Sequence, residues 1–376
     1  MKIALDCRRI QPGMSGLGTY TLQIMTALAD QIQQGKDELT VFITPESRRA
    51  AAIPTDRVNC IGVPWPVENH LAGDYWKHIT LPRLLDRSSV DVFHDPSYQL
   101  PLKRSRAAYV VTIHDLAPFR FPETNTLKYN LYWKFMTRSA VKRADRIIAV
   151  SEFTRKDIID LFPTSENRID VVPEAAAACF VPGEPTVERL ESLGVRKPYF
   201  LTAAKYEPRK NLERCVRAFM LGPARFHPDI KLVIAGAMGW KNKNLERYLQ
   251  EKGVQDRVVL TGYLERSVLV EIIQGAEAVL VPSIYEGFGL PVLESMACGT
   301  PVICSDAGSL PEIGADAALY FDPYDIESMA TVMNKFLFDS EMQIDLRRQA
   351  LERAVEFSWT QAARATLGVY RHALDK

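Results

Sequence analysis

The stretch AVLVPSIYEGFGLPVLESMACGTPVICS, residues 278–305, predicts a strand, a glycine-rich turn, a helix and a second strand in immediate succession. Residues 278–283 and 301–305 are short and apolar, as buried parallel strands are. Pro291 suits the first turn of a helix, where a missing N–H costs little, and Gly299 suits the helix end. The stretch therefore predicts a βαβ unit of a doubly wound α/β sheet.

Similar apolar runs, separated by segments of helical spacing, recur along the whole chain in two sets. Runs of this kind are typical of parallel strands that are covered on both faces. The first set is expected at residues 2–7, 39–44, 58–63, 90–94, 109–114, 146–151 and 168–173, and the second at 199–204, 231–236, 257–262, 278–283, 301–305 and 318–321. The sequence thus predicts two Rossmann-like domains, each with its ligand crevice at the carboxyl ends of its strands.

The length of 376 residues also exceeds what one hydrophobic core usually supports. Residues 173–198 contain four prolines and suggest a linker with one short helix. We therefore predict an N-terminal domain at 1–180 and a C-terminal domain at 181–357. Residues 358–376 have helical spacing; this last helix either closes the second domain or, as we expect, packs back toward the first.

Composition narrows the class of protein. The 46 basic and 46 acidic side chains cancel, which gives no electrostatic case for a nucleic-acid partner. The six cysteines form no C-x-x-C pair, so reduced thiols are expected rather than a disulfide framework or a zinc site. The start, MKIALDCRRI, lacks the apolar run of a secretory signal, and no stretch reaches the length of a spanning helix. We predict a cytoplasmic protein that is able to rest on the inner face of a membrane.

Two carboxylates lie on either side of the predicted helix start, Glu286 before it and Glu294 within it. Glycines at 287 and 289 let the backbone approach a ligand, and a helix start attracts anions. Because carboxylates would repel a bound phosphate, we interpret them as acceptors for hydroxyl groups on either side of it, which describes a nucleotide sugar. The alternative is an ordinary strand–turn–helix in which Glu294 pairs with a lysine.

Further candidates follow other predicted strands. Arg209 and Lys210, in AAKYEPRKNLERC, form a cationic pair that suits a diphosphate leaving group, although a solvated basic turn would look the same. His114 follows the strand at 109–114 and suits a hydrogen bond to a sugar, although a lone histidine is more often structural. The pair His94 and Asp95 ends a neighbouring strand and ranks lower.

Two glycine-containing turns add weaker signals. Gly16 and Gly18 open a helical segment that is predicted to begin near Thr19, but they lack the full dinucleotide-binding spacing, which disfavours a nicotinamide dehydrogenase. Tyr263 and Leu264 follow the strand at 257–262, where they either border a nucleotide base or simply end a strand. No D-x-D pair occurs in the chain, so we expect no metal and no cofactor besides the substrate.

These motifs, in this order, resemble glycosyltransferase family 4: the glycine-rich start, T-I-H-D-L, E-P-R-K-N-L, V-I-A-G, L-T-G-Y, E-G-F-G-L-P-V-L-E and the F-S-W tail. The resemblance covers nearly the whole chain and implies a GT-B fold of two facing Rossmann-like domains. One departure is Ala204-Lys205, where many members have glycine and arginine. The sequence therefore leaves open which cation acts at this position upstream of Arg209.

The resemblance also implies roles for individual residues. Glu286 would face the transferred sugar, Glu294 would bind the ribose, and His114 would contact the donor sugar, while Asp115 either holds the histidine ring or meets the acceptor. The backbone amides at the helix start would bind sugar and phosphate; these are the amides of Gly287, Phe288, Gly289 and Leu290. Arg209 and Lys210 would bind the diphosphate. The first loop, with Gly16 and Gly18, would approach the donor phosphate and the acceptor.

Residues 120–156 hold nine Lys/Arg against three Asp/Glu, with aromatics interleaved. A helix with one buried aromatic stripe and a wet basic face would explain this pattern. The alternative that we carry forward is contact with anionic lipid or with a lipid-diphosphate acceptor.

The sequence as a whole predicts a retaining hexosyltransferase that moves sugar from a nucleoside diphosphate to a saccharide or lipid-linked saccharide in bacterial surface polysaccharide synthesis. Two other classes stay open. A nucleotide-sugar epimerase of the same fold would alter the donor without any acceptor. A non-catalytic binding protein for sugar nucleotides or polysaccharides would bind the donor and release no nucleotide.

Overall fold

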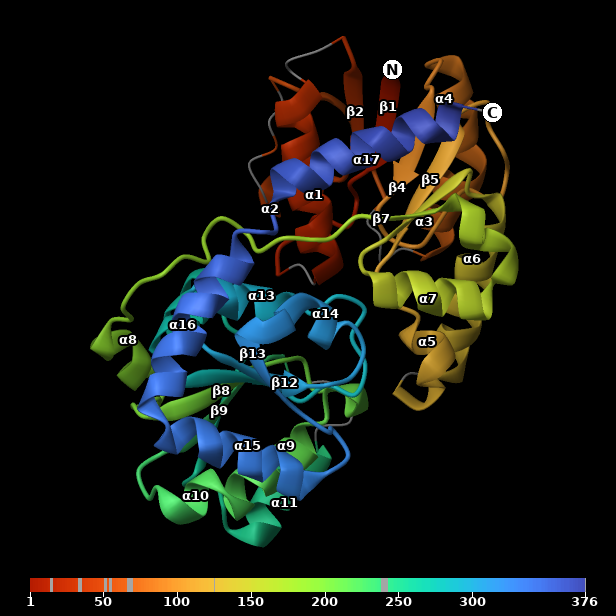
Figure 1. Cartoon of the computed structure of the whole chain (residues 1–376). Coiled ribbons are helices and arrows are strands. Elements are labelled where there is room, and N and C mark those ends of the chain that lie inside the picture. Colours follow the sequence, from red (N-terminus) through yellow and green to blue (C-terminus); the bar gives the residue numbers. More distant parts are fainter. Residues whose placement is uncertain are drawn as a thin grey trace. The chain divides into compact units, whose positions relative to one another are not determined.

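The computed structural model of the chain describes residues 1–376 apart from 14–15, 33–35, 51–52, 54–55, 66–69, 125, 238–242 and 376. The chain divides into two compact units, each built on its own parallel sheet (Figure 1). Unit 1 comprises Met1–Ala175 and Ser358–Lys376, and unit 2 comprises Ala176–Phe357. The first boundary falls at residue 175 rather than at the expected 180, because the chain is held in unit 1 up to Glu174, which bonds to His114.

The sheet of unit 1 is parallel throughout and has the order β3-β2-β1-β4-β5-β6-β7. Its strands are β1 (Lys2–Asp6), β2 (Glu38–Ile43), β3 (Asn59–Gly62), β4 (Val92–Asp95), β5 (Ala108–Ile113), β6 (Arg146–Ala149) and β7 (Ile169–Val171). Every strand predicted for this half of the chain is confirmed. The strand order reverses between β1 and β4, which makes the carboxyl ends of these two strands the expected position of a crevice.

Helices flank this sheet. They are α1 (Gly16–Ile32), α2 (Pro45–Ala50), α3 (His70–Tyr75), the π-helical turn η1 (Trp76–Thr80), α4 (Leu81–Arg87), α5 (Ala117–Arg120), the 3₁₀ turn η2 (Pro122–Thr124), α6 (Leu127–Arg143), α7 (Glu152–Leu161), the 3₁₀ segment η3 (Pro163–Arg168) and α17 (Trp359–Leu374). The prediction that the first helix begins near Thr19 is wrong, since α1 already begins at Gly16. Glycine costs little there, because the first-turn N–H groups have no intrahelical partners to lose.

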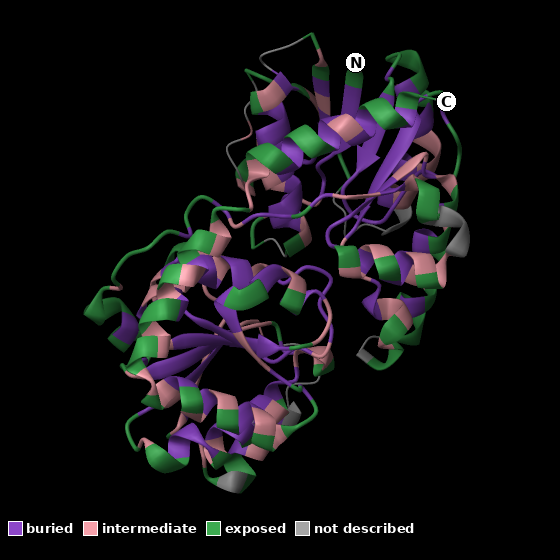
Figure 2. Ribbon diagram, viewed as in Figure 1, coloured by how far each residue is buried: buried purple, intermediate pink, exposed green. Residues whose placement is uncertain are grey.

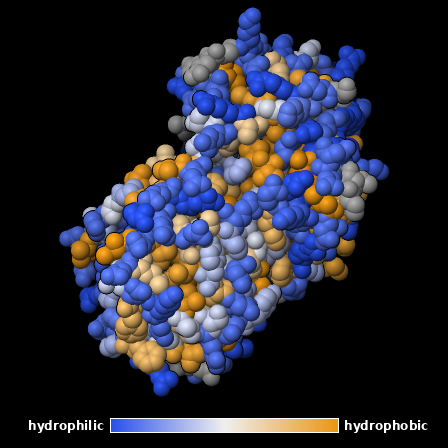
Figure 3. Space-filling view, in the orientation of Figure 1, coloured by the Kyte–Doolittle hydropathy of each residue, from blue (hydrophilic) through white to orange (hydrophobic). Residues whose placement is uncertain are grey.

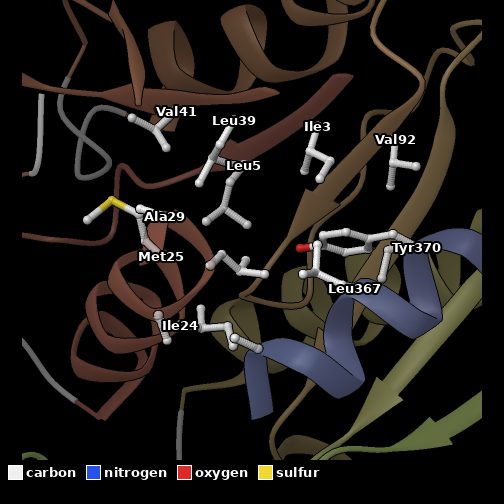
Figure 4. Close-up of a cluster of buried hydrophobic side chains, with 14 of the residues drawn as sticks. Ile3, Leu5, Ile24, Met25, Ala29, Leu39, Val41, Val92, Leu367 and Tyr370 are labelled. Carbon is white, nitrogen blue, oxygen red and sulfur yellow. The ribbon is translucent and has the colours of Figure 1, made fainter. Parts of the chain in front are cut away.

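The core of unit 1 joins segments from both ends of the chain. Figure 4 shows Ile3 and Leu5 of β1, Ile24 of α1, and Leu367 and Tyr370 of α17 pointing toward one another. The alternate residue of β1, Ala4, packs on the opposite face of the sheet. This period of two is what a strand buried on both faces requires. The final helix therefore packs against α1 in unit 1.

The sheet of unit 2 is also parallel, in the order β10-β9-β8-β11-β12-β13. Its strands are β8 (Tyr199–Ala203), β9 (Lys231–Ala235), β10 (Val258–Gly262), β11 (Ala278–Val281), β12 (Val302–Ser305) and β13 (Ala318–Phe321). All of them lie within the predicted runs. The order reverses between β8 and β11, so these two strands mark the expected crevice of unit 2.

The helical segments of unit 2 are α8 (Val187–Ser192), η4 (Pro208–Lys210), α9 (Leu212–Leu221), α10 (Pro223–Phe226), α11 (Lys243–Lys252), α12 (Arg266–Gly275), α13 (Leu290–Ala297), α14 (Leu310–Gly314), η5 (Ala315–Ala317), α15 (Ile326–Phe338) and α16 (Ser340–Ala354). Figure 2 shows the central strands of both sheets largely buried and the helices exposed along one side, while the edge strands β3 and β10 are less buried. Among the residues that the structure describes, none of the helices combines the length and the apolar character needed to cross a membrane.

Candidate active site

The crevice position of unit 2 is formed by the two loops that follow β8 and β11. The loop after β8 contains η4 with Arg209 and Lys210, and the loop after β11 contains Glu286. A backbone hydrogen bond from the Ile284 amide to the Arg209 carbonyl, 2.8 Å long, ties the loops together. The structure therefore brings Glu286 to the neighbouring residues Arg209 and Lys210, which precede it by 77 and 76 residues in the sequence.

Glu286 is the centre of this group. Its Oε2 accepts a hydrogen bond from Nη1 of Arg209 at 3.2 Å. Its Oε1 accepts hydrogen bonds from Oγ of Ser283 at 2.7 Å and from Nζ of Lys210. Only 7% of the residue is exposed. Glu286 is therefore a buried carboxylate shared by two cations.

Charge decides its protonation state. Burial by itself raises the pKa of Glu286, but the positive charges of Lys210 and Arg209, together with the hydrogen bonds from Lys210 and Ser283, lower that pKa to about 2. The side chain is thus an anion at neutral pH. It is a hydrogen-bond acceptor only, as contact with sugar hydroxyl groups requires.

The backbone of Glu286 is held from a neighbouring turn. The amide and the hydroxyl of Ser309 donate to the carbonyl oxygen of Glu286, at 3.2 and 3.1 Å. Gly308, with φ of +66°, approaches so closely that a Cβ atom there would lie 2.8 Å from the same carbonyl oxygen. Any larger residue at Gly308 would displace the turn, so glycine is required for this contact.

The loop then enters α13 as the sequence predicts. Gly289 precedes the helix with φ of +104°, and Pro291 lies in its first turn. Phe288 is buried against Phe357, with ring centroids 6.1 Å apart, so its ring packs in the interior and only its backbone is suited to a ligand. Glu294 lies one turn into α13 and is half-buried.

Other candidates lie at the same edge of the sheet. Tyr263 and Leu264 directly follow β10, and Tyr263 is exposed. In the loop after β8, Glu207 accepts from Nε of Arg209 at 3.0 Å and lies 3.5 Å from Nζ of Lys205. Lys205, which occupies the upstream position, therefore lies next to the same carboxylate, Glu207, that binds Arg209.

In unit 1, His114 is engaged through both ring nitrogens. Nδ1 lies 2.7 Å from Oε1 of Glu174, and Nε2 lies 2.9 Å from the carbonyl oxygen of Pro96. Both partners are acceptors, so both ring nitrogens carry protons when Glu174 is ionised. Burial is the largest single cause and lowers the pKa of His114, but Glu174, the Pro96 carbonyl and the charge of Asp115 together outweigh it, so the net direction is upward. A hydrogen bond to a donor sugar would need one of these two bonds to be released.

Glu174 carries no signal in the sequence that would have singled it out. The two glycines of the first loop both lie in α1, and residues 14–15 beside them are outside the described part of the chain. Oδ1 of Asp115 accepts from the amide of Ala117 at 3.1 Å, which stabilises the turn into α5.

His94 lies in the core of unit 1. Its Nδ1 is 2.7 Å from the hydroxyl of Tyr370, and its Nε2 is 2.8 Å from Oγ1 of Thr112. It is fully buried, and this burial, with a small contribution from nearby His114, lowers the pKa of His94 to about 3. His94, in β4, therefore links α17 to the sheet through its hydrogen bond with Tyr370.

This pKa predicts how stability depends on pH. Below its ordinary pKa of 6.5, an unfolded His94 takes up a proton that the folded residue refuses. This group therefore lowers stability as pH decreases, with a slope that approaches about 1.4 kcal/mol per unit well below pH 6.5 and a total of about 1.6 kcal/mol between pH 6.5 and pH 5. His114, whose pKa is raised by folding, contributes in the opposite direction in the upper part of this window, because its unfolded form still gains protons there. Urea denaturation at the two pH values measures the loss.

The matched control is His94→Gln, which removes the titrating ring. Its unfolding free energy should be lower at both pH values and should lose this part of the pH dependence. Equal slopes in the two proteins would contradict the assignment.

A second buried group of charges, which the sequence did not reveal, occupies the crevice position of unit 1. Arg8 donates to Asp6 from Nε at 2.9 Å and from Nη2 at 2.8 Å. Lys77, in η1, donates to Asp6 at 2.7 Å and also to Asp95. The Arg8 guanidinium lies 4.4 Å from the centre of the Trp76 ring.

The cluster is electrically balanced. Burial alone raises the pKa of Asp6, but Arg8 and Lys77 shift it well below its usual range. Asp95 also accepts from the amides of Ser97 at 2.7 Å and Gln99 at 3.2 Å, so it holds the loop after β4. Both oxygens of the Asp95 carboxylate therefore already accept hydrogen bonds from the protein, which indicates a structural role.

Across the described part of the chain, His, Cys, Asp and Glu side chains do not form a group of three that could hold a metal ion. The expectation that no metal takes part stays a prediction.

Two family models match consecutive parts of the chain. The model described as Glycosyltransferase Family 4 matches residues 14–198, and the model described as Glycosyl transferases group 1 matches residues 188–353. O-antigen chain mannosyltransferase B of Escherichia coli is 31% identical over 74% of this chain and 74% of that protein. Serotype-specific mannosyltransferase WbdA of Escherichia coli is 29% identical over 75% of this chain, a match that spans 36% of that protein.

Solved structures share the fold. Sucrose-phosphate synthase from Thermosynechococcus elongatus superposes with a TM-score of 0.77 over 99% of this chain and 98% of that chain, at 20% identity. Anabaena HepE in complex with UDP-glucose superposes with a TM-score of 0.75 over 98% of each chain, at 17% identity. Identities this low carry the architecture and nothing about individual site residues.

Proposed function

This chain belongs to the family 4 glycosyltransferases, and on that premise we propose that it transfers a mannosyl residue from a nucleoside diphosphate held by unit 2. As a member of this family it is a nucleotide-sugar-dependent hexosyltransferase of GT-B fold that takes part in surface polysaccharide synthesis. Mannose is our choice because the relatives described above are mannosyltransferases. The acceptor in this proposal is a hydroxyl group of a saccharide or of a lipid-linked saccharide, bound by unit 1.

One observation carries the assignment of the donor site: Glu286, Arg209 and Lys210 meet at the carboxyl ends of β8 and β11. The strand order reverses there, and such a point is where open α/β sheets bind ligands. A buried anion beside two cations is suited to a ligand that presents both hydroxyl groups and a diphosphate. In this assignment Glu286 receives the sugar, and the two cations receive the phosphates.

The chemistry requires one bond to break and one to form at the anomeric carbon of the donor. The bond from this carbon to the diphosphate oxygen breaks, and the acceptor oxygen attacks from the same face. Attack from this face retains the configuration without a protein nucleophile, and the acceptor proton passes to the departing diphosphate oxygen. Arg209 and Lys210 stabilise the negative charge that grows on the diphosphate, and fixed cations do so without reorganisation during the reaction.

The nucleotide half of the donor is assigned to the neighbouring loops. The helix start at Leu290 offers backbone amides to phosphate, and half-buried Glu294 accepts from the ribose hydroxyls. Exposed Tyr263, after β10, borders the base. These positions follow strands of one sheet, whose carboxyl ends share one edge.

A thermal-shift panel of GDP-, UDP-, dTDP- and ADP-sugars tests the donor site. The correct donor should raise the melting temperature, because a ligand that binds only the folded state stabilises it. Lys210→Ala should abolish this shift and lower sugar transfer by at least about a hundredfold, since it removes one of two phosphate cations. The matched control is Lys335→Ala, at an exposed lysine of α15, which should behave as the unaltered protein. A full shift in Lys210→Ala would contradict the assignment.

We also propose that α6 contacts an anionic membrane surface. Its 17 residues include five Lys/Arg and no Asp/Glu. Leu127, Leu131 and Phe135, spaced four apart on one face, are 74%, 60% and 59% exposed. Figure 3 shows hydrophobic residues interspersed among hydrophilic ones on the visible surface. On α6, exposed apolar residues and basic residues are mixed, which is typical of helices that lie in a lipid interface. A lipid surface therefore fits both the charge and the exposed apolar stripe of this helix.

Sedimentation with liposomes tests the membrane contact. Each basic residue near an anionic surface contributes about 1 kcal/mol, so changing Lys128, Lys134, Arg138 and Lys142 to alanine should lower the partition coefficient at low salt by roughly a hundredfold or more. Arg143 is left in place because its Nε donates to the carbonyl of Pro101 at 2.9 Å.

The control for this experiment removes the same charge elsewhere. The exposed unit 2 residues for it are Arg225, Arg247, Lys335 and Arg348. Their alanine variant should still sediment with anionic liposomes. Equal recovery of both variants would exclude α6 as the contact.

A further inference from the structure

The two cations assigned to the diphosphate are already paired with a carboxylate of the same chain. Nη1 of Arg209 donates to Oε2 of Glu286 at 3.2 Å, and Nζ of Lys210 donates to Oε1. The side chains of all three are nearly buried, with 15%, 12% and 10% exposed for Arg209, Lys210 and Glu286. Water therefore screens these ion pairs poorly, and they are strong.

A diphosphate that binds to these cations must displace that carboxylate. Both are acceptors only, and both are negatively charged, so they compete for the same N–H donors and repel each other. Keeping all of them together would leave the charge of Glu286 close to the phosphates and poorly compensated.

We propose that Glu286 holds the place of the diphosphate and that the donor displaces it: phosphate oxygens take over the N–H donors of Arg209 and Lys210, and the released Glu286 carboxylate turns toward the sugar hydroxyls. This inference rests on the donor site proposed above. It makes the sugar-binding position of Glu286 a consequence of diphosphate binding, so that the carboxylate is released only when a diphosphate occupies the site.

The surrounding contacts permit such a release. The backbone of Glu286 is fixed by Ser309, so only the side chain has to turn. Arg209 keeps a second carboxylate, Glu207, at 3.0 Å, which retains the guanidinium in the loop when Glu286 leaves. Lys210 carries its charge on a flexible stem with three N–H donors, which suits a change of partner.

Affinity for the free nucleoside diphosphates tests the proposal, with GDP and UDP titrated calorimetrically at fixed ionic strength. Glu286→Gln removes the competing charge and should bind the preferred diphosphate at least about tenfold more tightly than the unaltered chain. Glu352→Gln is the matched control, because it removes the same charge from an exposed pair with Arg348. It should leave the affinity unchanged.

A second variant removes only one of the hydrogen bonds that hold the Glu286 side chain in place. Ser283→Ala removes the 2.7 Å hydrogen bond to Oε1 and should tighten diphosphate binding by about threefold, without touching either cation. This second variant also protects the test against misfolding of Glu286→Gln, which circular dichroism would reveal.

The outcomes separate the two proposals. Diphosphate binding by the unaltered chain, with no gain in either Glu286→Gln or Ser283→Ala, would overturn this inference alone. Absence of diphosphate binding by the unaltered chain would overturn both this inference and the donor site. Tighter binding in Glu286→Gln, together with a smaller gain in Ser283→Ala, supports both.

Discussion

Glu286→Gln is expected to lower the rate of sugar transfer by at least about a thousandfold, because it removes the negative charge of the buried carboxylate that accepts hydrogen bonds from the sugar hydroxyls. Glutamine has nearly the same shape, so the loops after β8 and β11 should keep their path. Its side-chain NH₂ would, however, face the guanidinium of Arg209 or the ammonium of Lys210 in place of a carboxylate oxygen. Release of nucleoside diphosphate in the presence of donor and acceptor measures the effect.

Nucleotide binding separates loss of chemistry from loss of the site. Glu286→Gln should still bind the nucleoside diphosphate, whereas Lys210→Ala should lose both binding and transfer. The neutral substitution Glu352→Gln, on exposed α16, should retain the full rate. Full transfer activity in Glu286→Gln would remove this residue from the mechanism.

Lys77→Met is expected to cost about 3–5 kcal/mol of unfolding free energy, the usual result when one partner of a buried ion pair is removed. The side chain of Lys77 is only 3% exposed and bridges Asp6 and Asp95. Arg8 continues to compensate Asp6, but Asp95 keeps only the neutral donors of its own loop. Urea denaturation followed by circular dichroism measures the loss.

An exposed pair provides the comparison. Arg348→Met breaks a surface ion pair with Glu352 and should cost no more than about 1 kcal/mol. In the double variant Lys77→Met/Asp95→Asn, the buried charge left by the first change is removed, so the loss should be smaller than the sum of the two single losses. Equal costs for Lys77→Met and Arg348→Met would show that the buried network is not stabilising.

The predictions from the sequence succeeded where the signal is local. Strands β1 to β13 were located by their apolar runs, and the turn into α13 by Gly289 and Pro291, because these residues constrain the backbone by themselves. The start of α1 was misplaced, since glycine gives no local mark that tells a first helical turn from the loop before it.

The functional candidates were identified by residue type and by their position after a strand. The cationic pair Arg209 and Lys210 was interpreted separately from Glu286, and the sequence did not indicate that this one carboxylate pairs with both cations. That pairing depends on β8 and β11 being neighbours in the sheet, which is a matter of topology.

What the sequence determined by itself is therefore the set of elements, because backbone preferences and apolar spacing act over a few residues. Which side chains meet was decided only by the tertiary structure. Glu174 lies 60 residues from His114, and Lys77 lies 71 residues from Asp6. Hydrogen bonds and ion pairs act over a few ångströms, so partners this far apart along the chain are defined only once parallel strands bring their carboxyl ends to one edge.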